Sequence, residues 1–235
     1  MSVLVFIEYK NKVSKAALEA VSYGSKIGKV SVVTYGNIDS SELEILGKYG
    51  AEKVLVHKGI SSSNDQQITK LVAAAADQEN SNVIVLAQDQ TGKSIGPRIA
   101  AKLSAGHISG AIALPDTSNG FVVKTNVYSG KAFAHISVNT PIKVISLLAN
   151  SLPPEINEKT AEIVDFDADL GDARITVKEM KTQGEGIPLP EAELVVSAGR
   201  GLKGPENWGI VEELAESLGA TTACSRPVAD IGWRP

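Results

Sequence analysis

Two glycine-bearing segments have the residue types and spacing of phosphate-binding loops. In the more specific one, Gly199, Gly201 and Gly204 form the pattern G-x-G-x-x-G after an apolar run that ends at Ser197. Glycines there let the backbone approach a pyrophosphate, and a helix that follows adds N–H donors. We therefore expect a dinucleotide at this loop. An ordinary glycine-rich turn can have the same spacing, so the pattern alone is weak support.

The residues that follow this loop bear on which dinucleotide it takes. In NAD enzymes, an acidic residue about 20 positions further on binds the ribose. Here the next strand-like run ends in Cys224, Ser225 and Arg226 instead. A cationic Arg226 suits an anionic or electron-rich ligand better than an NAD ribose. This weakens the case for an NAD-dependent dehydrogenase.

The other segment, AQDQTGKS at 87–94, approaches the motif G-x-x-x-x-G-K-[ST] with alanine at its first position. In a P-loop-like nucleotide-hydrolysing enzyme, Lys93 would reach the terminal phosphates and Ser94 would hold magnesium. Asp89 argues against this function, because it puts a negative charge where the phosphates would lie. The alternative is a polar turn between a strand and a helix, with Gly92 opening the helix. We favour the turn and keep hydrolysis as a second hypothesis.

The remaining reactive residues show no spacing that would build a site. Three histidines, His57, His107 and His135, are far apart in the sequence, and we expect each to be a polar residue near a strand end. The single cysteine, Cys224, cannot form an intramolecular disulfide and fits a reducing compartment. We expect it to pack within a strand. The sequence thus predicts no catalytic residue and no metal ligand.

Composition places the chain among globular proteins. Of its 235 residues, 43% are hydrophobic and 21% are charged. The formal net charge of -4 argues against a broad cationic surface, and so against nucleic acid as a partner. No apolar run approaches the roughly 20 residues that span a bilayer. We expect a cytoplasmic protein that is not embedded in a membrane.

The predicted pattern of strands and helices that must position these loops changes along the chain. Up to Leu103, short β-branched runs alternate with amphipathic stretches, which predicts a parallel sheet covered by helices on both faces. Strands are predicted at 3–9, 29–35, 53–57 and 82–88, and helices at 14–27, 40–49, 65–79 and 92–103. Ser14 is the expected N-cap of the first helix. Four further strands, without helices between them, are predicted at 108–114, 121–128, 132–138 and 143–148.

In the last third of the chain, the sequence predicts a connection and then a second domain. An acidic stretch at 165–172 and a strand at 174–179 are interpreted as the connection, and Gly184, Gly186, Pro188 and Pro190 mark the break. Strands at 193–197 and 221–224 flank a helix from about 205 to 218. The fold class is α/β: a doubly wound, largely parallel domain with extra strands over 1–187, and over 188–235 the first βαβ unit of an incomplete Rossmann-like domain. A complete doubly wound domain has about five or six strands.

Four sequence blocks resemble the alpha subunit of electron-transfer flavoproteins. They are VLVFIE at 3–8; GKS at 92–94 with PRIAA at 97–101; YSGKA at 128–132; and VVSAGRGLK at 195–203, followed at the family's usual interval by ACSR at 223–226. The resemblance makes the segment around Lys93 a family element with no hydrolytic role. Later family segments, a Val-Gly-Gln-Thr turn and a Ser-Gly-Ala-Ile-Gln-His flavin loop, are absent. The resemblance is therefore to a C-terminally truncated subunit, which we expect not to complete the FAD site alone.

The resemblance implies an electron carrier rather than an enzyme that converts a substrate. It would accept electrons from flavoprotein dehydrogenases, such as the acyl-CoA dehydrogenases of fatty-acid β-oxidation, and pass them to a quinone oxidoreductase or another acceptor. It would form a heterodimer with a beta subunit that holds AMP or a second FAD. The matching positions imply FAD contacts at Gly199, Arg200, Gly201, Ser225 and Arg226, with Arg226 near the isoalloxazine ring. A cofactor-free assembly subunit is a third hypothesis.

Overall fold

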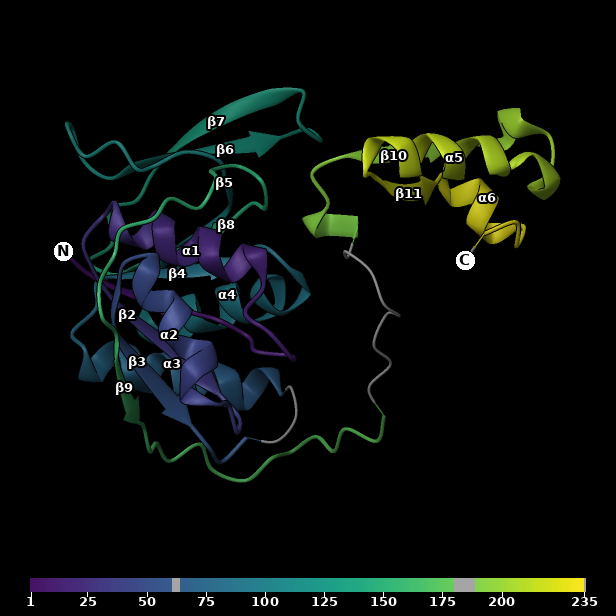
Figure 1. Cartoon of the computed structure of the whole chain (residues 1–235). Helices are drawn as coiled ribbons and strands as arrows, with labels where there is room; N and C mark the ends of the chain where they lie inside the picture. Colours follow the sequence, from purple (N-terminus) through teal and green to yellow (C-terminus); the bar gives the residue numbers. More distant parts are fainter. Residues whose placement is uncertain (61–63, 180–188, 235) are drawn as a thin grey trace. The chain divides into compact units, whose positions relative to one another are not determined.

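The computed structural model describes residues 1–60, 64–179 and 189–234 of the chain. The chain forms two compact units, Met1–Met180 and Lys181–Pro235 (Figure 1). The glycines and the proline predicted to mark the break, Gly184, Gly186 and Pro188, lie outside the described residues.

A nine-stranded sheet forms the centre of the first unit, in the order β7-β6-β5-β8-β4-β1-β2-β3-β9 (Figure 1). The strands from β5 across to β9 run parallel, and β6 and β7 form an antiparallel hairpin at one edge. This confirms the predicted α/β class with a largely parallel sheet and extra strands. The bounds are β1 Ser2–Phe6, β2 Lys29–Tyr35, β3 Ala51–His57, β4 Val83–Ala87, β5 Gly106–Ala111, β6 Val122–Val127, β7 Ala132–Ser137, β8 Lys143–Leu147 and β9 Glu162–Asp165.

Helices cover both faces of this sheet because its strands are apolar on both sides. In β1, Val3 and Val5 belong to one core with α1 and α2, whereas Leu4 and Phe6 belong to the other with α3 and α4. These four side chains are at most 4% exposed. The helices are α1 Lys15–Ser25, α2 Ser40–Lys48, α3 Asp65–Gln78 and α4 Gln90–Leu103. A parallel sheet buried in this way reads as continuous hydrophobic runs, as the sequence does.

The acidic segment interpreted as a connection belongs instead to the first unit. Residues Glu162–Asp165 form β9, which pairs in parallel with β3, and Phe166 and Leu170 are buried in the core beneath α3 and α4. The strand predicted at 174–179 is wrong, because those residues have no strand structure. The charged residues Glu162 and Asp165 interrupt the hydrophobic pattern that would otherwise have indicated β9. An edge strand tolerates them because its outer side chains meet water.

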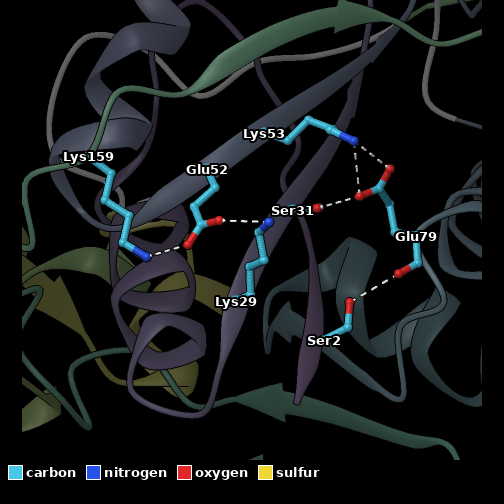
Figure 2. Close-up of polar contacts among 7 residues, drawn as sticks. All are labelled: Ser2, Lys29, Ser31, Glu52, Lys53, Glu79 and Lys159. Carbon is cyan, nitrogen blue, oxygen red and sulfur yellow. Dashed lines mark hydrogen bonds and ion pairs between the residues drawn. The ribbon is translucent and has the colours of Figure 1, made fainter.

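A segment over residues 152–161, which we call the strap, leads from β8 to β9 across α1 and α2. The backbone N–H of Glu155 donates to Ser22 Oγ at 2.9 Å, and that of Lys159 donates to the Gly47 carbonyl oxygen at 2.9 Å. The Glu52 carboxylate, shown in Figure 2, binds Lys159 at 2.5 Å and Lys29 at 3.1 Å. The strap thus fixes the edge strand to helices that are distant in sequence.

A second charged cluster closes the same end of the sheet (Figure 2). The Glu79 carboxylate accepts hydrogen bonds from Ser31 Oγ at 2.7 Å and from Lys53 Nζ at 3.1 Å, and its backbone oxygen accepts one from Ser2 Oγ at 3.1 Å. These contacts join three strands to the end of α3. All of its polar groups have partners within the protein, so the cluster is structural.

Aspartates that begin α2 and α4 differ in their electrostatics. Asp39 Oδ1 caps α2 by accepting from the Ser41 N–H, and the hydrogen bonds from Ser41 lower the pKa of Asp39. Asp89 Oδ1 caps α4 by accepting from the Gly92 N–H at 2.7 Å. Neighbouring protein atoms displace water around the Asp89 carboxyl and raise its pKa, and the charge of Glu8 adds to this, although the Gly92 bond opposes it. The predicted N-cap of α1, Ser14, is confirmed.

The second unit is built on one parallel strand pair. Strand β10, Val195–Ala198, pairs with β11, Thr221–Cys224, and α5, Gly209–Leu218, joins them. The predicted helix start at Pro205 is wrong, because Pro205–Asn207 forms a 3-10 turn and α5 begins after the buried Trp208. A short helix that the sequence did not predict, α6 Arg226–Asp230, follows β11.

Gly47→Ala tests the contact between α2 and the strap. An added Cβ would lie 2.5 Å from the Lys159 carbonyl oxygen and 2.9 Å from the Ala161 nitrogen, both of them backbone atoms. We expect a loss of about 1–3 kcal/mol in the free energy of unfolding of the first unit, which outweighs the gain in helix propensity. Urea unfolding followed by circular dichroism measures it. Glu44→Ala on the exposed side of α2 is the control, expected within about 0.5 kcal/mol of wild type.

Asp89→Asn and Asp39→Asn should change the pH dependence of stability in opposite directions. A raised pKa in the folded state means that wild type loses stability as pH rises above the ordinary aspartate pKa of about 3.9, so Asp89→Asn should gain relative to it. The lowered pKa of Asp39 reverses the sign and moves the window below that value, so Asp39→Asn should lose relative to wild type as pH rises through this lower window. Urea unfolding on both sides of about pH 3.9 measures both. Equal pH dependence in the two variants would contradict the prediction. Both tryptophans, Trp208 and Trp233, lie in the second unit. We therefore expect neither substitution to change the unfolding that their fluorescence reports.

Candidate functional site

The two turns singled out for a dinucleotide lie side by side in the second unit. Ala198 and Cys224 are paired at the carboxyl ends of β10 and β11, which places Gly199 beside Ser225. The Ser225 N–H donates to the Ala198 carbonyl at 3.0 Å, and a Cβ built on Gly199 would lie 3.4 Å from Ser225 Oγ. We call the five residues Gly199, Arg200, Gly201, Ser225 and Arg226 the β10–β11 edge. Parallel pairing therefore unites turns that are more than twenty residues apart in the chain.

The glycine loop differs from the predicted strand-to-helix turn. Arg200–Leu202 forms a 3-10 turn, with the Leu202 N–H donating to the Gly199 carbonyl at 3.2 Å. Lys203 then adopts a left-handed conformation, with φ of 68°. Because α5 starts only at Gly209, its N-terminus does not directly follow the third glycine. A 3-10 turn at Pro205–Asn207 separates the expected helix N–H donors of α5 from Gly204.

Charge and open space distinguish the β10–β11 edge. Arg200 is exposed, and the Arg226 side chain is 86% exposed. Arg226 Nε binds Asp230 Oδ1 at 2.6 Å, and this contact can orient the guanidinium group. A Cβ on Gly201 would meet no atom within 4 Å. The Ser225 side chain makes no capping bond to α6. The edge thus offers two guanidinium groups, a hydroxyl and an unobstructed backbone. These groups fit one side of an anionic dinucleotide such as FAD.

The loop around Lys93 uses its polar side chains within the protein. Ser94, the residue needed for magnesium, donates its hydroxyl to Asp65, and Thr91 donates to Glu8 Oε2 at 2.9 Å. The helix N-terminus is capped by Asp89. A phosphate at this position would meet two carboxylates and a helix end that is already capped. The geometry supports the polar turn and not the hydrolytic alternative.

His57, His107 and Cys224 are placed as structural residues, whereas His135 is exposed in the middle of β7 and not near a strand end as predicted. His57 is buried, with Nδ1 3.0 Å from the Phe166 carbonyl oxygen. His107 Nε2 lies 3.0 Å from Ser146 Oγ, and burial lowers the pKa of His107. Cys224 packs against the small core of the second unit. Within residues 1–60, 64–179 and 189–234, no group of three or more His, Cys, Asp and Glu could hold a metal ion.

The partner of Arg226 is the residue of this edge that the sequence reasoning missed. Asp230 lies four positions after Arg226, the spacing at which side chains meet on one helix face. Recognising α6 would have revealed the pair.

No helix in the described part of the chain is long and apolar enough to cross a membrane.

Two family models match the chain, one to each unit. Residues 3–170 match the electron transfer flavoprotein domain, and residues 188–235 match the electron transfer flavoprotein FAD-binding domain. The β10–β11 edge lies wholly within the second match.

Curated relatives agree with these matches. The electron transfer flavoprotein subunit alpha of Bacillus subtilis is 30% identical, over 92% of this chain and 69% of that protein. The subunit alpha of Pseudomonas aeruginosa is 29% identical, over 100% of this chain and 77% of that protein. The lactate dehydrogenase (NAD(+),ferredoxin) subunit LctC of Acetobacterium woodii is 26% identical, over 84% of this chain and 49% of that protein. This chain belongs to the electron transfer flavoprotein family, as an alpha subunit.

Proposed function

We propose that this chain carries electrons through an FAD held at the β10–β11 edge. The observation that supports it most is the contact between the turn at Gly199 and the turn at Ser225, which brings Arg200 and Arg226 to one end of a parallel strand pair. This edge lies in the part of the chain that matches a FAD-binding domain. The electrons come from flavoprotein dehydrogenases, such as acyl-CoA dehydrogenases, and go to a quinone oxidoreductase or another acceptor.

The chemistry of electron transfer belongs to the bound flavin, which can accept and release electrons. The chain's own residues bind and tune it. Arg226 would hold a guanidinium near the isoalloxazine ring, where it would favour the negative charge of the reduced form. Arg200 and Ser225 contact the dinucleotide, and Gly199 and Gly201 let it approach the backbone. Asp230 accepts a hydrogen bond from Nε of Arg226, which leaves the terminal nitrogens available to a ligand.

We further propose that the chain acts in a complex. Residues 1–187 form the domain that packs on a beta subunit, which holds AMP or a second FAD, and residues 188–235 supply part of the flavin site. The support is the match of residues 3–170 to the family's domain. A carrier of this kind converts no substrate of its own. The lone cysteine fits a cytoplasmic location.

Arg226→Ala tests this function in the assembled heterodimer. Without its cation, the reduced flavin loses a favourable charge interaction, so the reduction potential should fall by about 20–40 mV. Arg226→Lys should retain part of the effect. Spectroscopic redox titration measures the potential, and Lys131→Ala, which removes a cation from the first unit, is the control. An unchanged potential in Arg226→Ala, or an equal fall in the control, would count against the role of Arg226.

A further inference from the structure

A cationic groove of about 380 Å³ lies on the first unit, between α3, α4 and the segment that follows β9. Its lining includes Lys70 from α3, Arg98 and Lys102 from α4, and Arg174 beyond β9. Asp172 is the acidic residue of the lining. The groove thus gathers positive charge on a chain whose formal net charge is -4.

Most of this charge is not neutralised by the protein itself. Lys70 Nζ donates to the Leu170 carbonyl oxygen, which holds it at the wall of the groove. Arg98, Lys102 and Arg174 make no ion pair or side-chain hydrogen bond with any other residue that the structure describes. Arg98 and Lys102 are four positions apart on one helix, where like charges repel. An external anion would relieve this repulsion.

Several lysines elsewhere in the same unit form ion pairs. Lys29 and Lys159 share Glu52, and Lys53 binds Glu79, as Figure 2 shows. Lys26 likewise binds Glu155. Arg98, Lys102 and Arg174 differ from these lysines in having no such partner among the described residues, and all three line one groove.

The form of the groove favours a protein partner over a small enclosed anion. Its four cations are exposed and come from three separate segments. The backbone N–H groups at the start of α3, on Gln66 and Gln67, are already bound by Asn64 Oδ1. A specific small ligand is usually enclosed and held by a few fixed polar groups, and such groups are not found here. An extended chain with several carboxylates can meet all four cations at once.

We propose that this groove binds an acidic segment of a protein partner. Arg98, Lys102 and Arg174 pair with its carboxylates, while Lys70 contributes charge from the wall. Charge complementarity of this kind gives specificity and fast association. The proposal is independent of the flavin site, because all of its residues belong to the first unit.

Binding of a fluorescein-labelled decaglutamate peptide to the full chain tests the proposal. Fluorescence anisotropy at low salt should show binding to wild type, and added salt should weaken it because exposed charges are screened. Reversing both charges, with Arg98→Glu and Lys102→Glu, should weaken binding by about tenfold or more. Arg98→Gln with Lys102→Gln should give a smaller loss. The control pair, Lys48→Glu with Lys131→Glu, changes the net charge equally and should stay within about twofold of wild type.

Three results would overturn the proposal. The first is that the peptide does not bind wild type, and the second is that the control pair loses as much affinity as the groove pair. The third is that inorganic tripolyphosphate binds wild type through Arg98 and Lys102 whereas the peptide does not depend on them, which would make the groove a site for small anions. Circular dichroism establishes that each variant is folded, and the glutamine pair replaces the glutamate pair if the latter is not.

Discussion

Burial of the parallel sheet on both faces is the constraint on which the first unit depends. Side chains of β1 alternate between two cores, as Leu4 and Val5 do, and both are 0% exposed. Polar chemistry is therefore confined to strand ends, loops and the outer sides of helices. The strand ends near Lys93 are closed by contacts such as that of Thr91 with Glu8. The cationic groove lined by α3 and α4 is one of the places where this unit remains open.

Parallel strand pairing explains why the residues of the β10–β11 edge lie together in the second unit. Parallel strands end on the same side, so pairing β10 with β11 must bring the residues after Ala198 and Cys224 together. The turns after them supply the charges, and the packing of Trp208 and Val228 behind the strands keeps α5 and α6 in place. With only these two strands in its sheet, the described part of this unit offers one side of a ligand site.

Much of this arrangement could be predicted from the sequence where the pattern was strong. Strand β2 has the predicted bounds, and the contact between the turns at Gly199 and Ser225 follows from the βαβ pattern. Strand β9 could not be predicted, because its charges belong to an edge that only the tertiary structure defines. The start of α5 was predicted too early, because proline suits the first turn of an α-helix and also permits the 3-10 turn that forms there. The groove also depends on Arg174, which lines it together with residues of α3 and α4 and which no local pattern places there.

The most direct test of the account is to locate FAD on the chain by NMR. In a titration with FAD of the ¹⁵N-labelled chain assembled with its beta subunit, the account predicts that the largest amide shifts fall at Arg200 and Gly201 and at Ser225 and Arg226. Amides of the β6–β7 hairpin should not move. Shifts confined to the first unit, or a bound flavin that leaves the β10–β11 edge unchanged, would contradict the central claim.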